Sequence, residues 1–411
     1  MKKRILSIVM GLTMCVVLFS ACSSNQNGNT EAVTENSQTS AAGDVTEEEE
    51  SADESRDAAK APSGGQIIVE EGLPTEVSAK EGPNGETPSS PSDLVLTAEE
   101  VAKLKEGNYT AAICWHQGGD TYITKHTQFI TEMLEEVGIK VVAVTDAGLS
   151  TEQQLSDIET VMAMKPDIII GEPVDAVGTR EAWQKVTDAG IKLVFMDASG
   201  EGMKAGEDYV SCVSSDNYGN GVITAELLAE AIGGEGEVGM CYRNVNLYPV
   251  EQRKIGFMET MESKYPDIEI VESTPCETAA DCEDAMNAML LKHPNLKGAF
   301  GWYDEPCIVI AASARANGKS GTDFAVTGCD LGEDVALSLA QDDMVKGIAA
   351  QRIRAQARAL GILGCYGLLE KQAPEFVATP GLAVTHGNVV EAWRQCYGED
   401  PTEMIMNEAR K

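Results

Sequence analysis

The sequence predicts an α/β protein with two doubly wound lobes, each a parallel β-sheet covered by helices. Three observations predict this class: short apolar runs alternate with amphipathic helical patterns, the runs are apolar on both faces, and they form two consecutive series. Of the 411 residues, 43% are hydrophobic and 24% are charged, which is ordinary for a globular chain with a sizeable core. This length allows two or three lobes.

The net charge of the chain is strongly negative. It has 31 Lys and Arg against 66 Asp and Glu, a formal charge of −35. Phosphate backbones and anionic membrane faces are bound by clustered Lys and Arg. The composition therefore argues against a nucleic-acid partner and against adsorption to an anionic membrane surface.

The first 22 residues predict an export signal that ends in a lipid anchor. Lys2, Lys3 and Arg4 precede an apolar run at 5–19, shorter than the roughly 20 residues that a spanning helix needs. Residues 18–24, LFSACSS, resemble a bacterial lipobox, although Phe19 stands where that motif prefers leucine. We expect a signal peptide at 1–22, lipidation of Cys22, and anchoring to the cell membrane on its extracytoplasmic side. An ordinary signal peptide with a chance cysteine is the alternative.

Residues 23–97 predict a disordered, acidic linker. The stretch is rich in Ser, Thr, Gly, Pro, Asn and Glu, and holds 16 acidic residues against three basic ones. A segment of low hydrophobicity and high like charge cannot offset its ordering entropy. One apolar exception, QIIV at 66–69, has no place in this interpretation. The folded body is expected at 98–411.

The body contains ten candidate strands in two series. The first series is 111–115, 141–144, 167–170, 192–196 and 209–213. The second series is 237–241, 268–271, 298–302, 324–328 and 347–350. Apolar residues at steps of three and four from Ile123 to Val137 predict a helix between the first two strands, and Leu155 to Met162 do the same in the next connection. Right-handed crossovers then predict a parallel sheet in each lobe.

Polar side chains follow these strands, and in such sheets ligands bind at the carboxyl ends of the strands. The residues after the first series are His116, Asp120, Tyr122, Asp197 and Asn217. Those in the second series are Arg253, Tyr303, Asp330 and Gln351. The sequence therefore predicts one ligand site built from both lobes.

Six short segments carry a family resemblance. They are KPDIII (165–170), PVDA (173–176), SSDNYG (214–219), QRKIGF (252–257), YDE (303–305) and VTGCD (326–330). In this order and spacing, residues 108–398 resemble the type I periplasmic binding proteins, in the branch of ribose-binding-like solute-binding lipoproteins of sugar ABC transporters.

The resemblance implies two Rossmann-like lobes joined by a three-crossing hinge and closing on one small polyol. The crossings would fall near 215, 351 and 380. The N-lobe would take about 107–215 and 352–380, and the C-lobe about 216–351 and 381–398.

The resemblance also implies roles for individual residues. Asp197, Asp330 and Arg253 match positions whose carboxylates and guanidinium form paired, charge-assisted hydrogen bonds with vicinal hydroxyls. Asn217 and Gln351 match amide positions, which donate and accept at once. A helix N-cap is the alternative role for Asp330, since Asp is favoured there.

Tyr122 matches an aromatic position that packs on the C–H face of a sugar, with a core-facing helix residue as the alternative. Three site residues depart from the family pattern: His116 replaces a usual Ser, Tyr303 a frequent Asn, and Glu277 a frequent aromatic residue. We therefore hypothesise a ligand other than a plain pentose, with an amino group on the sugar as a partner for Glu277.

Enzyme motifs are weak. GKS at 318–320 lacks the glycine and the preceding strand of a P-loop, and the sequence has neither G-x-S-x-G nor H-E-x-x-H. The four histidines have no metal-like spacing, and His126 and His293 are expected at the surface or at helix caps. We expect no enzymatic activity, no cofactor and no metal.

Nine cysteines remain after Cys15 of the signal and Cys22 are set aside, an odd number that leaves at least one thiol unpaired within the chain. Cys276 and Cys282 are close enough in sequence to pair. The cysteines in or next to predicted strands are interpreted as small core residues: Cys114, Cys212, Cys241 and Cys329.

We interpret the chain as a monomeric solute-binding lipoprotein that captures a carbohydrate by hinge closure and delivers it to ABC permease subunits. One alternative is a sensor that passes occupancy to a membrane receptor or kinase. Another is a binder of a nucleoside or furanosyl autoinducer. A sugar hydrolase using Asp197 and Asp330 as paired carboxylates is less favoured.

Overall fold

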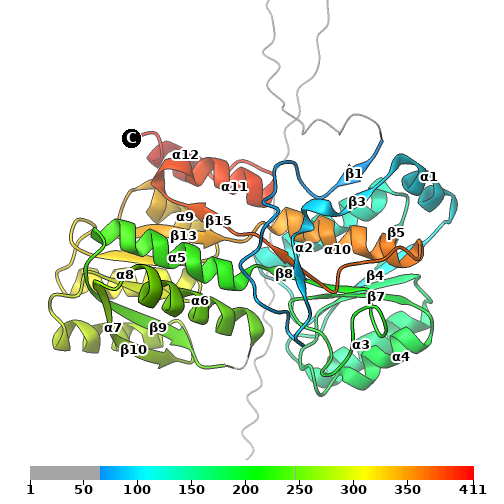
Figure 1. Cartoon of the computed structure of the whole chain (residues 1–411), viewed down its shortest axis with the longest axis horizontal. Coiled ribbons are helices and arrows are strands. Elements are labelled where there is room, and N and C mark those ends of the chain that lie inside the picture. The colour runs from blue at the N-terminus through cyan, green and yellow to red at the C-terminus, as the bar shows by residue number, and fades with distance from the viewer. Residues whose placement is uncertain (1–64, 246) are drawn as a thin grey trace, which may run out of the picture. The chain divides into compact units, whose positions relative to one another are not determined.

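The computed structural model describes residues 65–245 and 247–411, which form two large β-sheets that are parallel except at one edge, and one small antiparallel pair of strands (Figure 1). The signal peptide, Cys22 and the linker up to residue 64 lie outside these residues. A seven-stranded sheet has the order β2-β14-β8-β7-β6-β4-β5, and a six-stranded sheet has the order β10-β9-β11-β12-β13-β15. The edge strand β15 is antiparallel to β13. The predicted two-lobed α/β class is confirmed.

The seven-stranded sheet has helices on both faces. Its strands are β2 (Pro88–Ser89), β4 (Thr110–Trp115), β5 (Lys140–Asp146), β6 (Ile168–Gly171), β7 (Lys192–Met196), β8 (Ser211–Ser215) and β14 (Phe376–Thr379). The helices are α2 (Thr121–Glu136) and α10 (Ile353–Leu368) on one face, and α3 (Thr151–Ala163) and α4 (Arg180–Asp188) on the other. Ile168 and Ile170 pack under the first pair, and Ile169 packs under the second. This double coverage explains why the strand is apolar at every position.

The six-stranded sheet repeats this plan. Its strands are β9 (Gly236–Arg243), β10 (Ile268–Cys276), β11 (Gly298–Gly301), β12 (Ala325–Cys329), β13 (Val345–Ala350) and β15 (Leu382–Val384). The helices are α5 (Asn217–Ile232) and α6 (Tyr248–Lys264) on one face, α7 (Asp281–Lys292), α8 (Asp304–Ala316) and α9 (Glu333–Ala340) on the other, and the terminal α11 (Val389–Tyr397) and α12 (Glu403–Glu408). All ten predicted strands are present, whereas β14 and β15 were not predicted.

The chain passes from one sheet to the other three times. The passages follow β8, β13 and β14, since the next strand after each of these belongs to the other sheet. The three-crossing hinge implied by the resemblance is therefore present. Within the described residues, no helix has both the length and the apolar character needed to cross a bilayer.

Residues 65–97, here called the N-terminal strap, are ordered. They were predicted to be the last part of a disordered linker, so that prediction is corrected here. The strand β1 (Ile67–Ile68) pairs antiparallel with β3 (Val95–Leu96), and β2 adds to β14. The short helix η1 (Pro91–Asp93) follows β2, and α1 (Ala98–Glu106) follows the strap. The prediction from average composition failed because a few apolar side chains are enough to order a segment that docks on a core built by the rest of the chain. Leu96 of the strap, for example, is completely buried.

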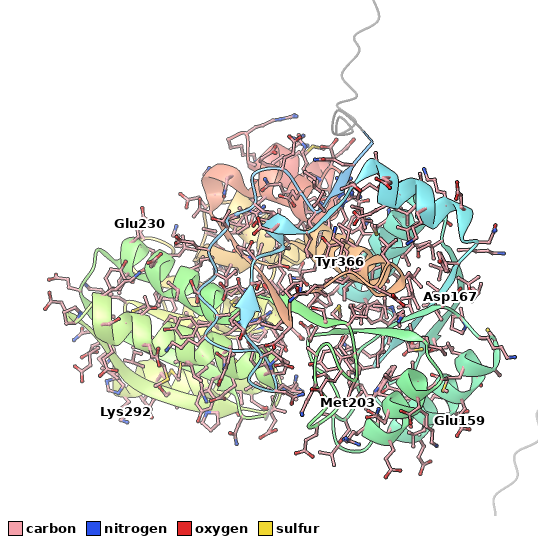
Figure 2. All side chains as sticks on the ribbon, turned by 45° about the vertical axis from the view of Figure 1, so that its right-hand side comes forward. Glu159, Asp167, Met203, Glu230, Lys292 and Tyr366 are labelled. Carbon is pink, nitrogen blue, oxygen red and sulfur yellow. The ribbon has the colours of Figure 1, made fainter. Side chains whose placement is uncertain are left out.

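The strap contacts both halves of the molecule. Its Val95 exchanges two hydrogen bonds with the hydroxyl of Tyr366 on α10, at 2.9 and 3.0 Å. Figure 2 labels Tyr366 near the middle of the molecule. Toward the other sheet, Lys80 pairs with Glu259 of α6 at 2.6 Å. Between the two, the Ser78 amide donates to Asp216, which immediately follows β8 at the first passage. The strap therefore runs across the hinge.

Candidate ligand-binding site

Two aspartates that directly follow strands of different sheets have backbone angles that are strained for a residue other than glycine. Asp197 directly follows β7 and Asp330 directly follows β12, with φ of +57° and +71°. Left-handed backbone is uncommon for residues other than glycine and concentrates at functional sites. The N-cap alternative for Asp330 is wrong, because α9 begins at Glu333 with Gly332 as its N-cap.

Arg253 is the buried cation of this region. Its side chain is 2% exposed. Its two terminal nitrogens meet both oxygens of Asp330 at 2.9 and 3.3 Å, and Nε donates to Oδ1 of Asn217 at 2.9 Å. The ring of Tyr303 lies 5.2 Å from the guanidinium carbon. Arg253 thus fixes the plane of the Asp330 carboxylate in a bidentate pair.

The remaining residues close a ring of polar contacts. The amide of Gln351 donates to Asp330 at 2.8 Å, and the hydroxyl of Tyr122 lies 3.3 Å from both the Gln351 oxygen and Oδ2 of Asp197. The Ser214 hydroxyl donates to Asp197 at 2.6 Å and receives a bond from Asn217 at 2.9 Å. The polar ring is therefore Asp197, Tyr122, Gln351, Asp330, Arg253, Asn217 and Ser214.

Two glycines bring the helices of the ring together. A Cβ at Gly221 of α5 would lie 2.2 Å from the backbone oxygen of Arg253, and a Cβ at Gly256 of α6 would lie 2.1 Å from that of Tyr218. The backbones of α5 and α6 can approach this closely only without side chains at these positions. This approach places Arg253 of α6 against Asn217, the first residue of α5.

Gly256→Ala is expected to destabilise the fold by about 1–3 kcal/mol or more, because the obstructing atom is backbone and cannot rotate away. Separation of α5 from α6 would also break the contact between Arg253 and Asn217. Urea unfolding measures the loss, and Glu262→Ala on the exposed face of α6 is the matched control. Equal stability of the two variants would contradict the close-approach argument.

His116 forms a buried pair with Glu172, a residue that the sequence analysis missed. Nδ1 of His116 lies 2.9 Å from Oε2 of Glu172. Burial raises the pKa of Glu172 to about 7, although His116 opposes the shift. Burial lowers the pKa of His116, but the adjacent Glu172 carboxylate outweighs burial, so that this pKa is raised. Glu172 follows β6 directly, so the rule that found the other site residues applies to it too.

The raised pKa values make stability depend on pH. Between the unfolded pKa of 4.5 and the folded pKa of about 7, the folded chain keeps the Glu172 proton while the unfolded chain loses it. Stability therefore falls as pH rises through this window, and the His116 contribution is also lost as pH rises through its own raised pKa. In Glu172→Gln, the free energy of unfolding is expected to fall by about 2–3 kcal/mol less than in the parent as pH rises, since one pKa unit corresponds to about 1.4 kcal/mol.

Urea unfolding at pH 5 and pH 8 tests this expectation. The exposed Glu159→Gln on α3 is the control and is expected to keep the parent's pH dependence. An unchanged fall in stability for Glu172→Gln would contradict the role assigned to the pair.

The remaining predicted site residues lie outside the polar ring. Asp120 is exposed and caps α2 by accepting from the Ile123 amide at 2.7 Å. Glu277 is exposed just after β10, and its side chain has no hydrogen bond or ion pair with the ring in the described part of the chain. Tyr303 packs against Arg253 at the start of α8.

Two residues missed by the sequence analysis support the ring from beneath. Gln356 of α10 is fully buried and donates to the oxygen of Gln351 at 3.1 Å. His126 is fully buried 4.3 Å from the ring centre of Tyr122 and contacts Gln356 at 3.2 Å. The expectation of His126 at the surface or at a cap was wrong, since α2 turns it toward α10.

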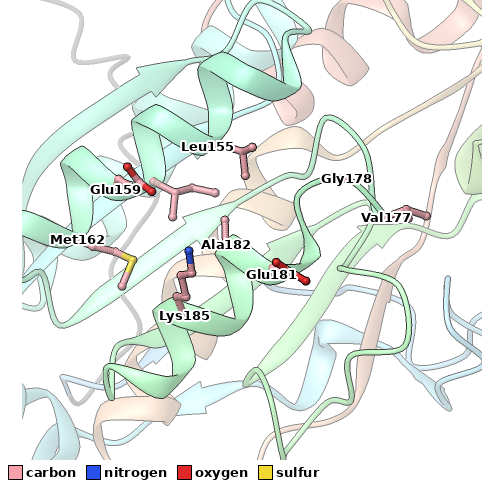
Figure 3. Close-up of a pocket in the computed structure, with 9 residues that line it drawn as sticks. Leu155, Glu159, Met162, Val177, Gly178, Glu181, Ala182 and Lys185 are labelled. Atoms are coloured by element: carbon pink, nitrogen blue, oxygen red, sulfur yellow. The ribbon is translucent and has the colours of Figure 1, made fainter.

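A cavity of about 400 Å³ lies elsewhere, between α3 and α4 (Figure 3). Glu159 on one helix and Glu181 and Lys185 on the other line it together with aliphatic side chains. No member of the polar ring lines this cavity, so it is separate from the candidate site.

Comparisons with known proteins agree with this architecture. Residues 111–361 match the family model described as periplasmic binding protein domain. The ribose import binding protein of Bacillus subtilis is 26% identical over 220 residues, which cover 52% of this chain and 67% of the relative. The D-ribose/D-allose-binding protein of Pseudomonas aeruginosa is 27% identical over 227 residues, which cover 55% of this chain and 70% of the relative.

Solved structures share the fold. An ABC transporter solute-binding protein from Agrobacterium vitis, bound with alpha-D-tagatopyranose, aligns with a TM-score of 0.61 at 23% identity, covering 71% of this chain and 100% of that one. An ABC transporter periplasmic solute-binding protein from Actinobacillus succinogenes, with bound D-allose, aligns with a TM-score of 0.60 at 24% identity, covering 68% and 99%. The family match covers more than half of the chain, and the chain belongs to the periplasmic binding protein family.

Proposed function

We propose that the polar ring binds a sugar or related polyol, and that the protein is the solute-binding subunit of an ABC transporter. The observation that carries the proposal is the pair of carboxylates, Asp197 and Asp330, which end strands of different sheets and join one ring. The family consists of binding proteins, so the activity is capture and not catalysis. Two relatives named for ribose or allose binding support a carbohydrate as the ligand class.

The ring suits vicinal hydroxyls. The Asp330 carboxylate is a quarter exposed while its partner Arg253 is almost fully buried, so Asp330 presents the accessible acceptor and Arg253 orients it. Tyr122 adds an aromatic face with a hydroxyl at its edge. A polyol that bonds to Asp197 and Asp330 together would bridge the two sheets and would favour the arrangement of the lobes in which both carboxylates face it.

A thermal-shift screen tests the ligand class. The panel contains pentoses, hexoses, polyols, aminosugars and nucleosides, and the protein must keep residues 65–97. A ligand at 100 times its Kd stabilises by about 2.7 kcal/mol, so a carbohydrate hit is expected to raise the Tm. Asp330→Ala should abolish the shift, while the surface variant Asp343→Ala should keep it. A hit with nucleosides alone, or none from folded and ligand-free protein, would contradict the proposal.

We further propose that the protein acts as a monomer, lipidated at Cys22 and held at the outer side of the cell membrane, where it delivers its ligand to permease subunits. Support for the anchor comes from the lipobox-like LFSACSS segment. In the producing cell, Cys22→Ser should release the protein from the membrane fraction. Retention of that variant on the membrane would contradict lipid anchoring, and a dimer mass in solution would contradict the monomer.

Glu277→Gln is expected to leave the affinity for neutral sugars unchanged, because Glu277 is exposed and separate from the ring. The hypothesis of an amino-bearing ligand predicts a loss for aminosugars only, by up to about fivefold, since an exposed ion pair contributes up to about 1 kcal/mol. Titration calorimetry with a matched sugar and aminosugar measures both. Equal affinities of parent and variant for the aminosugar would remove Glu277 from the site.

A further inference from the structure

Three buried cysteines from separate elements converge outside the ligand site. Cys241 lies in β9, Cys276 ends β10, and Cys282 is the second residue of α7. Their sulfur atoms all lie within 4.8 Å of one another, and each side chain is at most 2% exposed. We call them the thiol cluster. Among the described residues, it is the single group of three or more potential metal ligands of this compactness.

The local structure keeps the three sulfurs on one face of the sheet. In the parallel pairing of β9 and β10, Cys241 lies opposite Thr274, two residues before Cys276. Residues two apart point to the same side of a strand. The helix α7 covers this side, since a Cβ at Gly239, two residues before Cys241, would lie 2.7 Å from the sulfur of Met289 in α7.

The loop between two of the thiols is pinned by hydrogen bonds. One oxygen of Asp281 accepts from the amides of Glu277 and Thr278 at 3.1 and 2.8 Å, and from the Thr278 hydroxyl at 3.0 Å. These bonds hold the chain that joins Cys276 to Cys282. The cluster is therefore preorganised, and little loop entropy has to be lost when a ligand binds it.

We propose that Cys241, Cys276 and Cys282 bind one soft, thiophilic metal ion, with monovalent copper preferred over zinc. Sulfur ligands select soft ions such as Cu(I) and Zn²⁺. A metal–sulfur bond of about 2.3 Å, as in zinc thiolates, brings ligand sulfurs within about 4 Å of one another, so small side-chain rotations complete the site. Structural zinc sites use four protein ligands. The cluster supplies three, which suffices for Cu(I).

Metal binding at the thiol cluster is coupled to the release of protons. Each cysteine that becomes a thiolate ligand releases its proton to solvent, so binding is pH-dependent. Without metal, three neutral thiols are compatible with the core, so folding does not require the ion.

The test uses the reduced protein under nitrogen, titrated with Cu(I) in competition with a chromophoric chelator. We expect one equivalent of Cu(I) per chain, weaker binding of Zn²⁺ in a parallel titration, and sulfur as the sole class of neighbour in copper X-ray absorption. Cys241→Ala, Cys276→Ala and Cys282→Ala should each weaken binding at least tenfold. Cys396→Ala, at another buried cysteine, is the matched control and should bind as the parent does.

Several outcomes would overturn the proposal. They are no retained metal in either titration, equal affinity in all four variants, oxygen or nitrogen neighbours of the bound copper, or a disulfide within the cluster in protein isolated under nitrogen. The absorption measurement needs only the parent protein, so it decides the matter even where a variant does not fold. The proposal is independent of the sugar function, because no ring residue belongs to the cluster.

Discussion

Arg253→Ala is expected to abolish sugar binding and to weaken the fold. The substitution removes the bidentate partner of Asp330, the donor to Asn217 and the donor to the backbone oxygen of Trp302 at 3.3 Å. Loss of one partner from a buried ion pair costs about 3–5 kcal/mol in stability. The lower end applies here, since Asp330 is a quarter exposed. A ligand that depends on Asp330 should bind at least thirtyfold more weakly, which corresponds to about 2 kcal/mol.

Two comparison variants separate the site effect from a general loss of charge. Arg253→Lys keeps the charge but cannot make two parallel bonds to one carboxylate, so it should recover part of the stability and little of the affinity. Arg315→Ala removes the exposed ion pair with Asp343 and should change stability by less than about 1 kcal/mol. Calorimetry and urea unfolding give both quantities. Undiminished affinity in Arg253→Ala would exclude the polar ring as the binding site.

The sequence predicted most of the ring because the rule behind it is topological. Strands apolar on both faces imply a parallel sheet, and the residues just after those strands must share one edge. Asp197, Asp330 and Gln351 satisfy this rule and meet in the structure. Glu172 satisfies it equally, directly after β6, and could have been found by the same argument.

Other features depend on contacts that no local pattern records. Gln356 sits inside α10, where a polar residue in a helix gives no sign that it lies under the polar ring. The thiol cluster unites Cys241 with cysteines 35 and 41 positions away, and each alone is typical of a small core residue. Both groupings arise where a helix packs on a sheet, and a local sequence pattern does not reveal which residues meet there.

The strap shows that composition is also a poor predictor of disorder when a segment packs against the rest of the chain. Its mean composition is that of a flexible linker, and residues 65–97 nevertheless bury Ile67, Val69, Leu73, Leu94 and Leu96. Composition predicts whether a segment can form a core of its own. It does not register that a segment can complete a core built by residues far along the chain, as β2 does when it extends the sheet beside β14.

Removal of the strap is expected to have the second large effect. A chain that joins the preceding segment directly to Ala98 would leave β14 as an unprotected sheet edge and expose the apolar surface that Leu96 and Ile67 cover. It would also remove the contacts with Asp216 and Glu259 on either side of the hinge. We expect aggregation or a Tm lower by several degrees, together with altered ligand affinity because the hinge is no longer bridged.

Leu96→Ala provides a graded version within the full chain. Leu96 is completely buried, so truncation should cost about 2–5 kcal/mol. The exposed strap residue Glu76→Ala is the matched control and should fall within about 0.5 kcal/mol of the parent. Urea unfolding compares the three proteins, and limited proteolysis reports whether the strap is released. If Leu96→Ala matched the parent in stability and the strap were cleaved first in both, the segment would be the flexible linker that its composition suggests, and its contacts across the hinge would carry no weight in closure.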